Sequence, residues 1–346
     1  MHVDKTVARR EFLKLVGTVG GAVVGAGGLA GSTRAANRVG RRLRSEGIKA
    51  AKDNYVYLSI VTQVPFWVDH KKALKDFSKV TGAHTSFTGP PDFNVQAQAS
   101  QLDQLISRKP DGIVIFIGDA QAMTPGINRA VAAGIPVILV ISDAPKSKRF
   151  SVIGINGVDA GRFGADQLAK AIGGKGEVIL GTFPSPNVLD RVKGYKQRFK
   201  QHYPGIKVVQ TVNDKADPSY APQAYAAALT AHPKVVGIGG TDGDSGLGAA
   251  RAVIEAGKTK KIKIMAMDRN DDMLAQVKKG NIVGSVVQKS YDEMWLACWM
   301  LYWLKHNQLR PVPDWHAARI NPLPERLTTG VWGLNRRNVN QFVHKK

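Results

Sequence analysis

The chain has 346 residues, of which 43% are hydrophobic, with 36 glycines and 17 prolines. This length suits about two domains of ordinary size, and the composition excludes a largely disordered chain. The net charge of +22 would suggest a nucleic-acid partner, but the basic runs are dispersed and not interleaved with aromatic residues, so we expect no nucleic-acid binding. The single cysteine, Cys298, excludes an intramolecular disulfide and a cysteine-based metal cluster.

The first 36 residues have the pattern of an export signal of the twin-arginine type. Arg9-Arg10 precedes a glycine-rich segment without charge, from Leu15 to Thr33, and small residues predict cleavage near Ala35 or Ala36. Glycines break this segment too often for a convincing membrane span, although a disordered or membrane-anchoring N-terminus is the alternative. The signal predicts a periplasmic protein, and residues 37–53 form a basic linker.

Beyond the linker, strand-like apolar runs alternate with amphipathic, helix-like segments. The runs are continuously apolar, which predicts burial on both faces and therefore parallel sheets with right-handed crossovers. The pattern restarts around Asn156-Gly157, so we predict an α/β protein of two doubly wound parallel-sheet domains. The apolar runs begin at Tyr55, Gly112, Ile135, Phe150, Gly176, Ile206, Val235, Ile262 and Ile282.

The segment from Val235 to Val253 contains a strand, glycines and a helix in the order of a phosphate-binding loop. A dinucleotide fingerprint that starts at Gly237 and Gly239 would need its third glycine at Asp242. A carboxylate there would repel phosphate, so the segment suits a ligand rich in hydroxyl groups. Asp244 could contact the ligand or act as the N-cap of the helix that follows.

Other chemical patterns are weak in this chain. The histidines show no metal-ligand spacing, Gly246 occupies a ligand position of a possible calcium loop, and no Gly-x-Ser-x-Gly motif occurs. We therefore expect no metal site, no cofactor and no enzymatic activity. An apolar run from Met294 to Leu304 is shorter than the ~20 residues needed to span a bilayer and predicts a buried helix.

Three segments resemble the periplasmic sugar-binding proteins of ABC transporters, in particular the ribose-binding group. They are "GIPVILVISDAPKSKRFSVIGINGVDAGRFGADQL", "TAHPKVVGIGGTDGDSGLGAARAV" and "MDRNDDMLAQVKKGNIVGSVVQKSYDEMW". The resemblance extends from about Tyr55 to Lys305 in the same order and spacing. It implies a type I periplasmic binding protein, with two lobes and a ligand cleft between them.

The resemblance also implies the site residues. The family's stacking aromatic residues match Phe66 and Trp67, for which a position in the core is the alternative. Its polar ligand contacts match Arg191, Asp242, Asp268 and, at the hinge, Gln288, because carboxylates, amides and guanidinium groups suit adjacent hydroxyls. Asp143 completes the predicted set, and further candidates are Gln63, Asp119 and Ser142.

Two positions depart from the family pattern. Many relatives have an aspartate where this chain has Ile141, and no aromatic residue stands near Ala216-Asp217, where the family has one. A standard pentose pocket is therefore not implied, and a deoxy, amino or non-sugar polyol stays open.

The resulting prediction is a monomeric receptor that binds a sugar or polyol by hinge closure and is recognised by an ABC transporter permease. The N-terminal lobe comprises residues 54–156 and 289–318, the C-terminal lobe residues 157–288, and residues 319–346 form a tail that crosses back over the lobes. The hinge lies at Asn156, Gly157, Gln288 and Lys289, with a third crossing near residues 316–321. The alternatives are an exported dinucleotide-dependent oxidoreductase and a sugar sensor that feeds a chemoreceptor or a histidine kinase.

Overall fold

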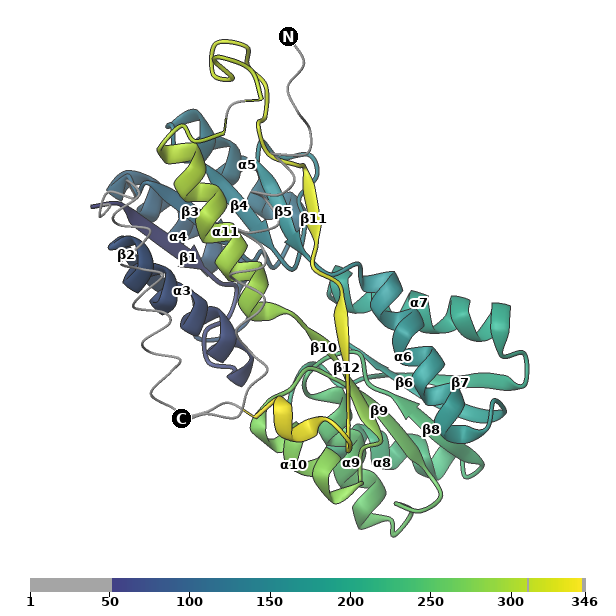
Figure 1. The fold of residues 1–346 in the computed structure, drawn as a ribbon. Helices are drawn as coiled ribbons and strands as arrows, with labels where there is room; N and C mark the ends of the chain where they lie inside the picture. The colour runs from purple at the N-terminus through teal and green to yellow at the C-terminus, as the bar shows by residue number, and fades with distance from the viewer. Residues whose placement is uncertain (1–51, 310, 344–346) are drawn as a thin grey trace, which may run out of the picture. The chain divides into compact units, whose positions relative to one another are not determined.

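The computed structural model describes residues 52–309 and 311–343. The predicted export signal, and the basic linker up to residue 51, lie outside the described residues. Two six-stranded sheets with helices on both faces make up the described chain (Figure 1). The predicted fold class, two doubly wound and mainly parallel sheets, is confirmed.

The first sheet has the strand order β11-β5-β4-β3-β1-β2, and all of its neighbouring strands are parallel. Its middle strands consist of buried apolar residues, which is why they appear in the sequence as continuous apolar runs. The strands are β1 (Asn54–Leu58), β2 (His84–Thr88), β3 (Gly112–Ile115), β4 (Val137–Val140), β5 (Ser151–Gly154) and β11 (Arg326–Thr328).

Helices cover both faces of this sheet. Helices α4 (Val95–Arg108) and α5 (Ala120–Ala132) share one apolar core with the strands. Helix α11 (Ser290–Lys305) contacts β3, β4 and β5, and its thiol Cys298 is buried. Helix α3 (Val68–Thr81), which follows the 3-10 turn η1 (Pro65–Trp67), packs Phe77 against Tyr55 of β1.

The second sheet has the order β12-β10-β9-β8-β6-β7, and only the pair β10 and β12 is antiparallel. The strands are β6 (Gly176–Thr182), β7 (Ile206–Asn213), β8 (Val235–Gly239), β9 (Lys263–Met267), β10 (Gly284–Gln288) and β12 (Val331–Asn335). Leaving out β11 and β12, the two sheets have the same order, so that β4 of the first corresponds to β9 of the second.

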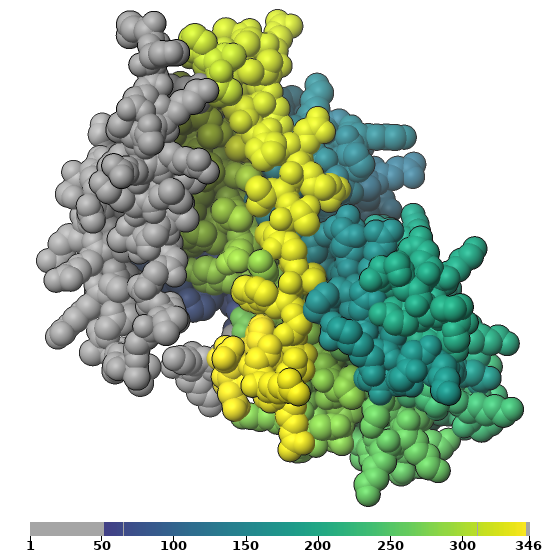
Figure 2. Space-filling view, turned by 45° about the vertical axis from the view of Figure 1, so that its right-hand side comes forward, coloured from purple at the N-terminus to yellow at the C-terminus, as the bar shows by residue number. Residues whose placement is uncertain are grey.

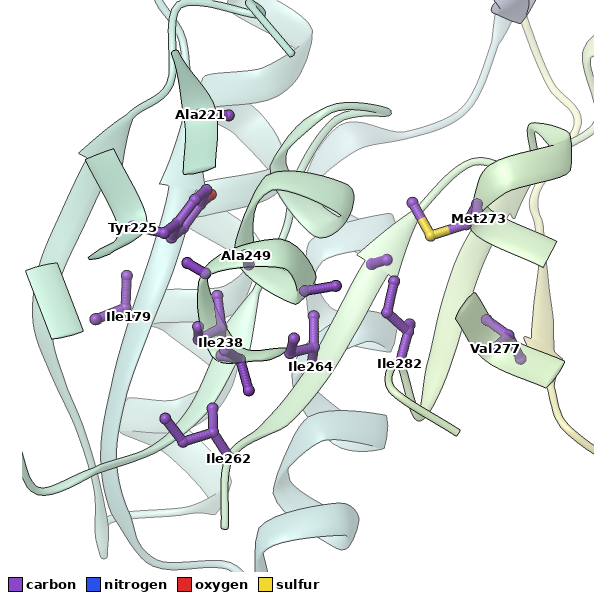
Figure 3. Packing of buried hydrophobic residues seen from close by; sticks show 14 of the residues in the cluster. Ile179, Ala221, Tyr225, Ile238, Ala249, Ile262, Ile264, Met273, Val277 and Ile282 are labelled. Carbon is purple, nitrogen blue, oxygen red and sulfur yellow. The ribbon is translucent and has the colours of Figure 1, made fainter. Parts of the chain in front are cut away.

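The second sheet has a separate apolar core on each face. One contains Tyr225 and Ala249 from helices α8 (Ala221–Ala231) and α9 (Ser245–Glu255), together with α10 (Asp271–Lys279) (Figure 3). The other lies under α6 (Gly157–Ile172) and α7 (Pro186–His202). This arrangement places the strand ends of β8, β9 and β10 beside the starts of α9 and α10.

The C-terminal segment contributes one strand to each sheet, with β11 beside β5 and β12 beside β10, and is followed by the 3-10 turn η2 (Val339–Gln341). Figure 2 shows this segment, in yellow, along the surface. The chain passes from one sheet to the other between Thr328 and Val331. The third crossing predicted near residues 316–321 is therefore wrong, since a pattern of prolines and polar residues gives no signal for strand pairing.

Candidate functional site

Three predicted site residues form one hydrogen-bonded chain at the strand ends of the second sheet. Gln288, the last residue of β10, donates from Nε2 to Oδ1 of Asp268 over 2.9 Å. Arg191 of α7 donates from Nη2 to Oε1 of Gln288 over 3.2 Å, and from Nη1 to the carbonyl oxygen of Thr241 over 2.7 Å. Arg191 is only 3% exposed and Gln288 only 4%, so both side chains are held rigidly beside Asp268.

The position of Arg191 depends on a close approach of α6 and α7. A Cβ atom built on Gly161 of α6 would lie 2.0 Å from the carbonyl oxygen of Arg191, and one built on Gly194 of α7 would lie 2.1 Å from that of Val158. Only glycine permits these backbone contacts. The pair of glycines therefore brings Arg191 to the strand ends.

Asp242 lies in the same region but serves its own loop. Its Oδ1 accepts hydrogen bonds from the backbone amides of Asp244 (2.9 Å) and Ser245 (3.0 Å), and its Oδ2 lies 2.5 Å from Oγ of Ser245. Asp244 stands at the N-cap position of α9, the second of the two roles left open for it, but its side chain makes no capping bond; Asp242 accepts from the amides at this helix start instead.

This site contains more acidic than basic side chains. Burial raises the pKa of Asp268, while Arg191 and the bond from Gln288 oppose that rise. Burial lowers the pKa of Arg191, and Asp268, Asp242 and Glu293 oppose it. Burial, with Asp242 and other neighbouring acids, raises the pKa of Asp244 to about 7. A ligand that donates hydrogen bonds would relieve this excess of acceptors.

The two predicted aromatic residues have different surroundings. Trp67 is 2% exposed and its ring contacts Tyr57, Phe87 and Phe116, so the structure favours the core alternative for Trp67. Trp67 has a helix-like spacing with buried residues, which is why the sequence was compatible with both a core position and a ligand contact. Phe66 is partly exposed and lines a cavity, where its ring can contact a ligand.

That cavity is lined by Phe66 of η1 and, near the strand ends of the second sheet, by Gly243, Asp268 and Gln288. Arg191 and Asp242 do not line it. Arg191 binds the lining residue Gln288, and Asp242 holds the loop that contains the lining residue Gly243. Asp69 and Arg269 also line it. Nη2 of Arg269 lies 2.6 Å from both carboxylate oxygens of Asp69.

Sequence reasoning missed this ion pair. Asp69 and Arg269 are 200 residues apart, and although Arg269 lies in the third segment that resembles the family, no local signal indicates that the two meet. Asn270 and Ser290, which line the same cavity, were missed as well. Asn270 follows Asp268 closely and caps α10 by accepting from the amide of Met273, which is a signal that could have been read.

Two predicted contacts have other roles in the structure. Asp143 binds Arg149 through Nε at 2.5 Å and Nη2 at 2.9 Å, and also Arg326 at 2.7 Å, so arginines occupy its carboxylate. Asp119 caps α5 by accepting from the amide of Ala122. Neither is brought to the group around Arg191: two arginines satisfy the carboxylate of Asp143, and helix capping satisfies that of Asp119.

The remaining predicted residues are two ligand-binding candidates, Ser142 and Gln63, and the hinge residues. Ser142 is 7% exposed, and its hydroxyl has no hydrogen-bond partner among the described residues. Gln63 is exposed in the loop after β1. Among the predicted hinge residues, Asn156 caps α6, which begins at Gly157, and Nζ of Lys289 lies 5.3 Å from the ring centre of Trp332.

The described part of the chain contains no group of three or more His, Cys, Asp or Glu side chains that could hold a metal ion. Within the same residues, no helix is both long enough and apolar enough to cross a membrane.

A protein family described as the periplasmic binding protein domain matches residues 55–308. The chain belongs to this family. The xylitol-binding protein of Mycolicibacterium smegmatis is 26% identical to this periplasmic binding protein over 272 residues, which are 76% of this chain and 77% of the relative. The ribose import binding protein of Bacillus subtilis is 24% identical over 69% of this chain and 77% of its own length.

Solved structures agree with this family. AraP, an arabinose-binding protein from Geobacillus stearothermophilus, matches with a TM-score of 0.76 and 31% identity, over 84% of this chain and 99% of its own. A sugar-binding protein of a sugar ABC transporter from Bacillus halodurans matches with a TM-score of 0.79 and 27% identity, over 84% and 100%. The resemblance to periplasmic sugar-binding proteins is thus confirmed, and these relatives are binding proteins rather than enzymes.

Proposed function

We propose that this periplasmic binding protein is the solute receptor of an ABC transporter and that it binds a sugar or related polyol in the cavity beside Asp268. The observation that carries the proposal is the chain from Arg191 through Gln288 to Asp268 at the strand ends. Parallel α/β sheets bind ligands at this edge. Oδ2 of Asp268 accepts no hydrogen bond from the described residues, so it is available to a ligand hydroxyl.

The chemistry of the cavity supports a hydroxylated ligand. Asp268 and Gln288 offer oxygen acceptors next to buried donors, and Phe66 offers an apolar ring face. A mostly preformed pocket with a few polar groups of this kind orients a small ligand. The relatives' names add weight, since xylitol, ribose and arabinose are all polyols or sugars.

We propose that ligand binding favours closure of two lobes about the segments Asn156-Gly157 and Gln288-Lys289. The N-terminal lobe would comprise residues 54–156 and 289–318, and the C-terminal lobe residues 157–288, with β11 and β12 added to the first and second lobe. A ligand that contacts both lobes shifts the population toward the closed form by its differential affinity. In this proposal the protein is exported by the twin-arginine route, acts as a monomer and presents its closed form to a permease.

A thermal-shift experiment tests the site. Xylitol, ribose, arabinose and allose serve as probes, and a probe at 100 times its Kd should stabilise the native state by about 2.7 kcal/mol. Asp268→Asn should abolish that shift, because the amide replaces an acceptor with a donor. Asp103→Asn is the matched control, since Asp103 is exposed and pairs with Arg129 on the first lobe. Equal shifts in both variants would refute the site.

A further inference from the structure

A single hydroxyl group bridges two carboxylates in the second sheet's lobe. Oγ of Ser245 lies 2.5 Å from Oδ2 of Asp214 and 2.5 Å from Oδ2 of Asp242. A serine hydroxyl has one proton and can donate only one hydrogen bond. If both carboxylates were ionised, one of the two short contacts would join two oxygens without a proton between them.

The remaining hydrogen bonds decide which acid is charged. Oδ1 of Asp242 accepts from the backbone amides of Asp244 and Ser245, and such bonds favour the ionised form. Asp214 accepts from the amide of Ala216 and, at the longer distance of 3.2 Å, from the hydroxyl of Tyr225. Asp214 and Ser245 are completely buried, whereas Asp242 is 6% exposed. Asp214 is thus the better place for an extra proton.

Close packing around Gly181 holds Ser245 and Tyr225 near Asp214. A Cβ atom built on Gly181 of β6 would lie 2.0 Å from the hydroxyl oxygen of Tyr225 and 2.7 Å from Oγ of Ser245. The absence of a side chain at Gly181 therefore admits this arrangement, and the close packing leaves the bridge short.

Other charged groups lie around the same bridge. Asp217 lies on the loop of Asp214, Asp244 follows Asp242, and Asp268 directly follows β9; Arg191 of α7 is the cation that acts on Asp242 and Asp268. Burial, with the nearby charge of Asp242, raises the pKa of Asp214 to about 6, although its bonds from Ser245, Ala216 and Tyr225 act in the opposite direction. This rise agrees with the hydrogen-bond geometry.

We propose that the carboxyl groups of Asp214 and Asp242 hold one acid proton between them, with Asp214 in its acid form donating to Ser245 and the Ser245 hydroxyl donating its own proton to Asp242. Asp214 is then a positioning residue, because it acts through Ser245 to hold Asp242 and the loop in which Gly243 lines the cavity. The link to ligand binding rests on the proposed function, but the proton-sharing bridge does not. Loss of the proton would place a second negative charge against Asp242 and disturb that loop.

The test is the pH dependence of the unfolding equilibrium of the purified chain, measured in urea without any sugar. A folded-state pKa above that of the unfolded chain means that the stabilisation is present at low pH and lost as the pH rises from about 4 to about 6. Relative to Asp214→Asn, the wild-type unfolding constant should increase by up to tenfold per pH unit in this window. The asparagine of that variant is not titratable, yet its amide can donate to Ser245 as the acid does.

Two further variants make the result decisive. Asp214→Ala should be less stable than Asp214→Asn at every pH, because Tyr225 loses its bond to Asp214 and Ser245 keeps only its bond to Asp242. Asp217→Asn should keep the wild-type pH dependence, since exposed Asp217 only accepts from the amides of Ser219 and Tyr220. Either of two results would overturn the proposal: an unchanged pH dependence in Asp214→Asn, or equal stability of the Asn and Ala variants. Failure of the proposed function would appear only in the sugar-dependent thermal shift.

Discussion

Ile141 and Asp268 occupy corresponding positions in the two sheets, and both have a φ of +68°. Ile141 directly follows β4, and Asp268 directly follows β9. A hydrogen bond of 2.7 Å from the amide of Ser142 to the carbonyl of Val140 closes a tight turn around Ile141. A β-branched residue is rare at positive φ, and such strain costs roughly 1–3 kcal/mol. The strand-end backbone is therefore shared, while only one of the two positions carries an acid.

Ile141→Asp should give the first sheet the acceptor that Asp268 provides in the second. We expect a folded protein, because the cost of burying a carboxylate, roughly 1–3 kcal/mol, is offset in part by relief of the strain of a β-branched residue at positive φ. Its thermal-shift response to xylitol, ribose, arabinose and allose should differ in order from that of the wild type. Ile141→Ala is the control for loss of the side chain alone, and an identical response of the Asp and Ala variants would contradict this role.

Arg191→Met should destabilise the protein even without ligand. Arg191 is 3% exposed and its charge acts on Asp268, Asp242 and Glu293, so its removal leaves buried acids without their cation. Breaking a buried charge network in this way costs about 3–5 kcal/mol. Arg251→Met on α9 is the control, because its exposed pair with Glu255 should contribute less than about 1 kcal/mol. Urea denaturation measures both, and similar losses would mean that Arg191 has no such role.

Glu293→Gln should flatten the dependence of stability on pH below pH 8. Glu293 is fully buried, and burial raises its pKa to about 8; its Oε2 lies 4.0 Å from Nε2 of His70. Since this folded-state pKa is raised, the stabilisation present below the unfolded pKa is lost as the pH rises toward 8. Burial lowers the pKa of His70 to about 3, so His70 destabilises the fold only on acidification below about 6.5.

Between pH 6.5 and 8, the pH dependence of stability therefore contains the contribution of Glu293 but not that of His70. Wild-type protein should lose up to about 2 kcal/mol more than Glu293→Gln across this window. Asp214 and Asp244 titrate in both proteins and cancel in the comparison. Parallel profiles, measured as unfolding free energies in urea, would show that Glu293 is already ionised at pH 6.5.

Gly181→Ala should lower the free energy of unfolding by roughly 1–3 kcal/mol or more, as expected for overpacking of a close contact. The added methyl group would meet the hydroxyl of Tyr225 at 2.0 Å and Oγ of Ser245 at 2.7 Å. Gly243→Ala is the matched control, because its nearest neighbour would be Oδ2 of Asp268 at 3.6 Å. Thermal unfolding should therefore show a large loss for the first variant and a loss below about 1 kcal/mol for the second; comparable melting temperatures would contradict the packing argument.

The sequence alone was sufficient for the fold class and for most strands. Burial on both faces makes a central strand continuously apolar, and nine such runs match β1, β3 to β5 and β6 to β10. The edge strand β2 was not predicted, because its sequence "HTSFT" is short and half-exposed. The pairing of β12 with β10 could not be predicted from the sequence either, since it joins segments distant along the chain.

For the candidate site, residue type and order along the strands were enough to select Arg191, Asp268 and Gln288. Only the tertiary structure decided which carboxylates are already satisfied: Asp143 is bound by two arginines, and Asp242 by its own loop. It also decided that Asp69 meets Arg269 across 200 residues. A local pattern records the burial of a strand and the types of its end residues, whereas the partner of a charged side chain depends on which distant segments the fold brings within hydrogen-bonding distance.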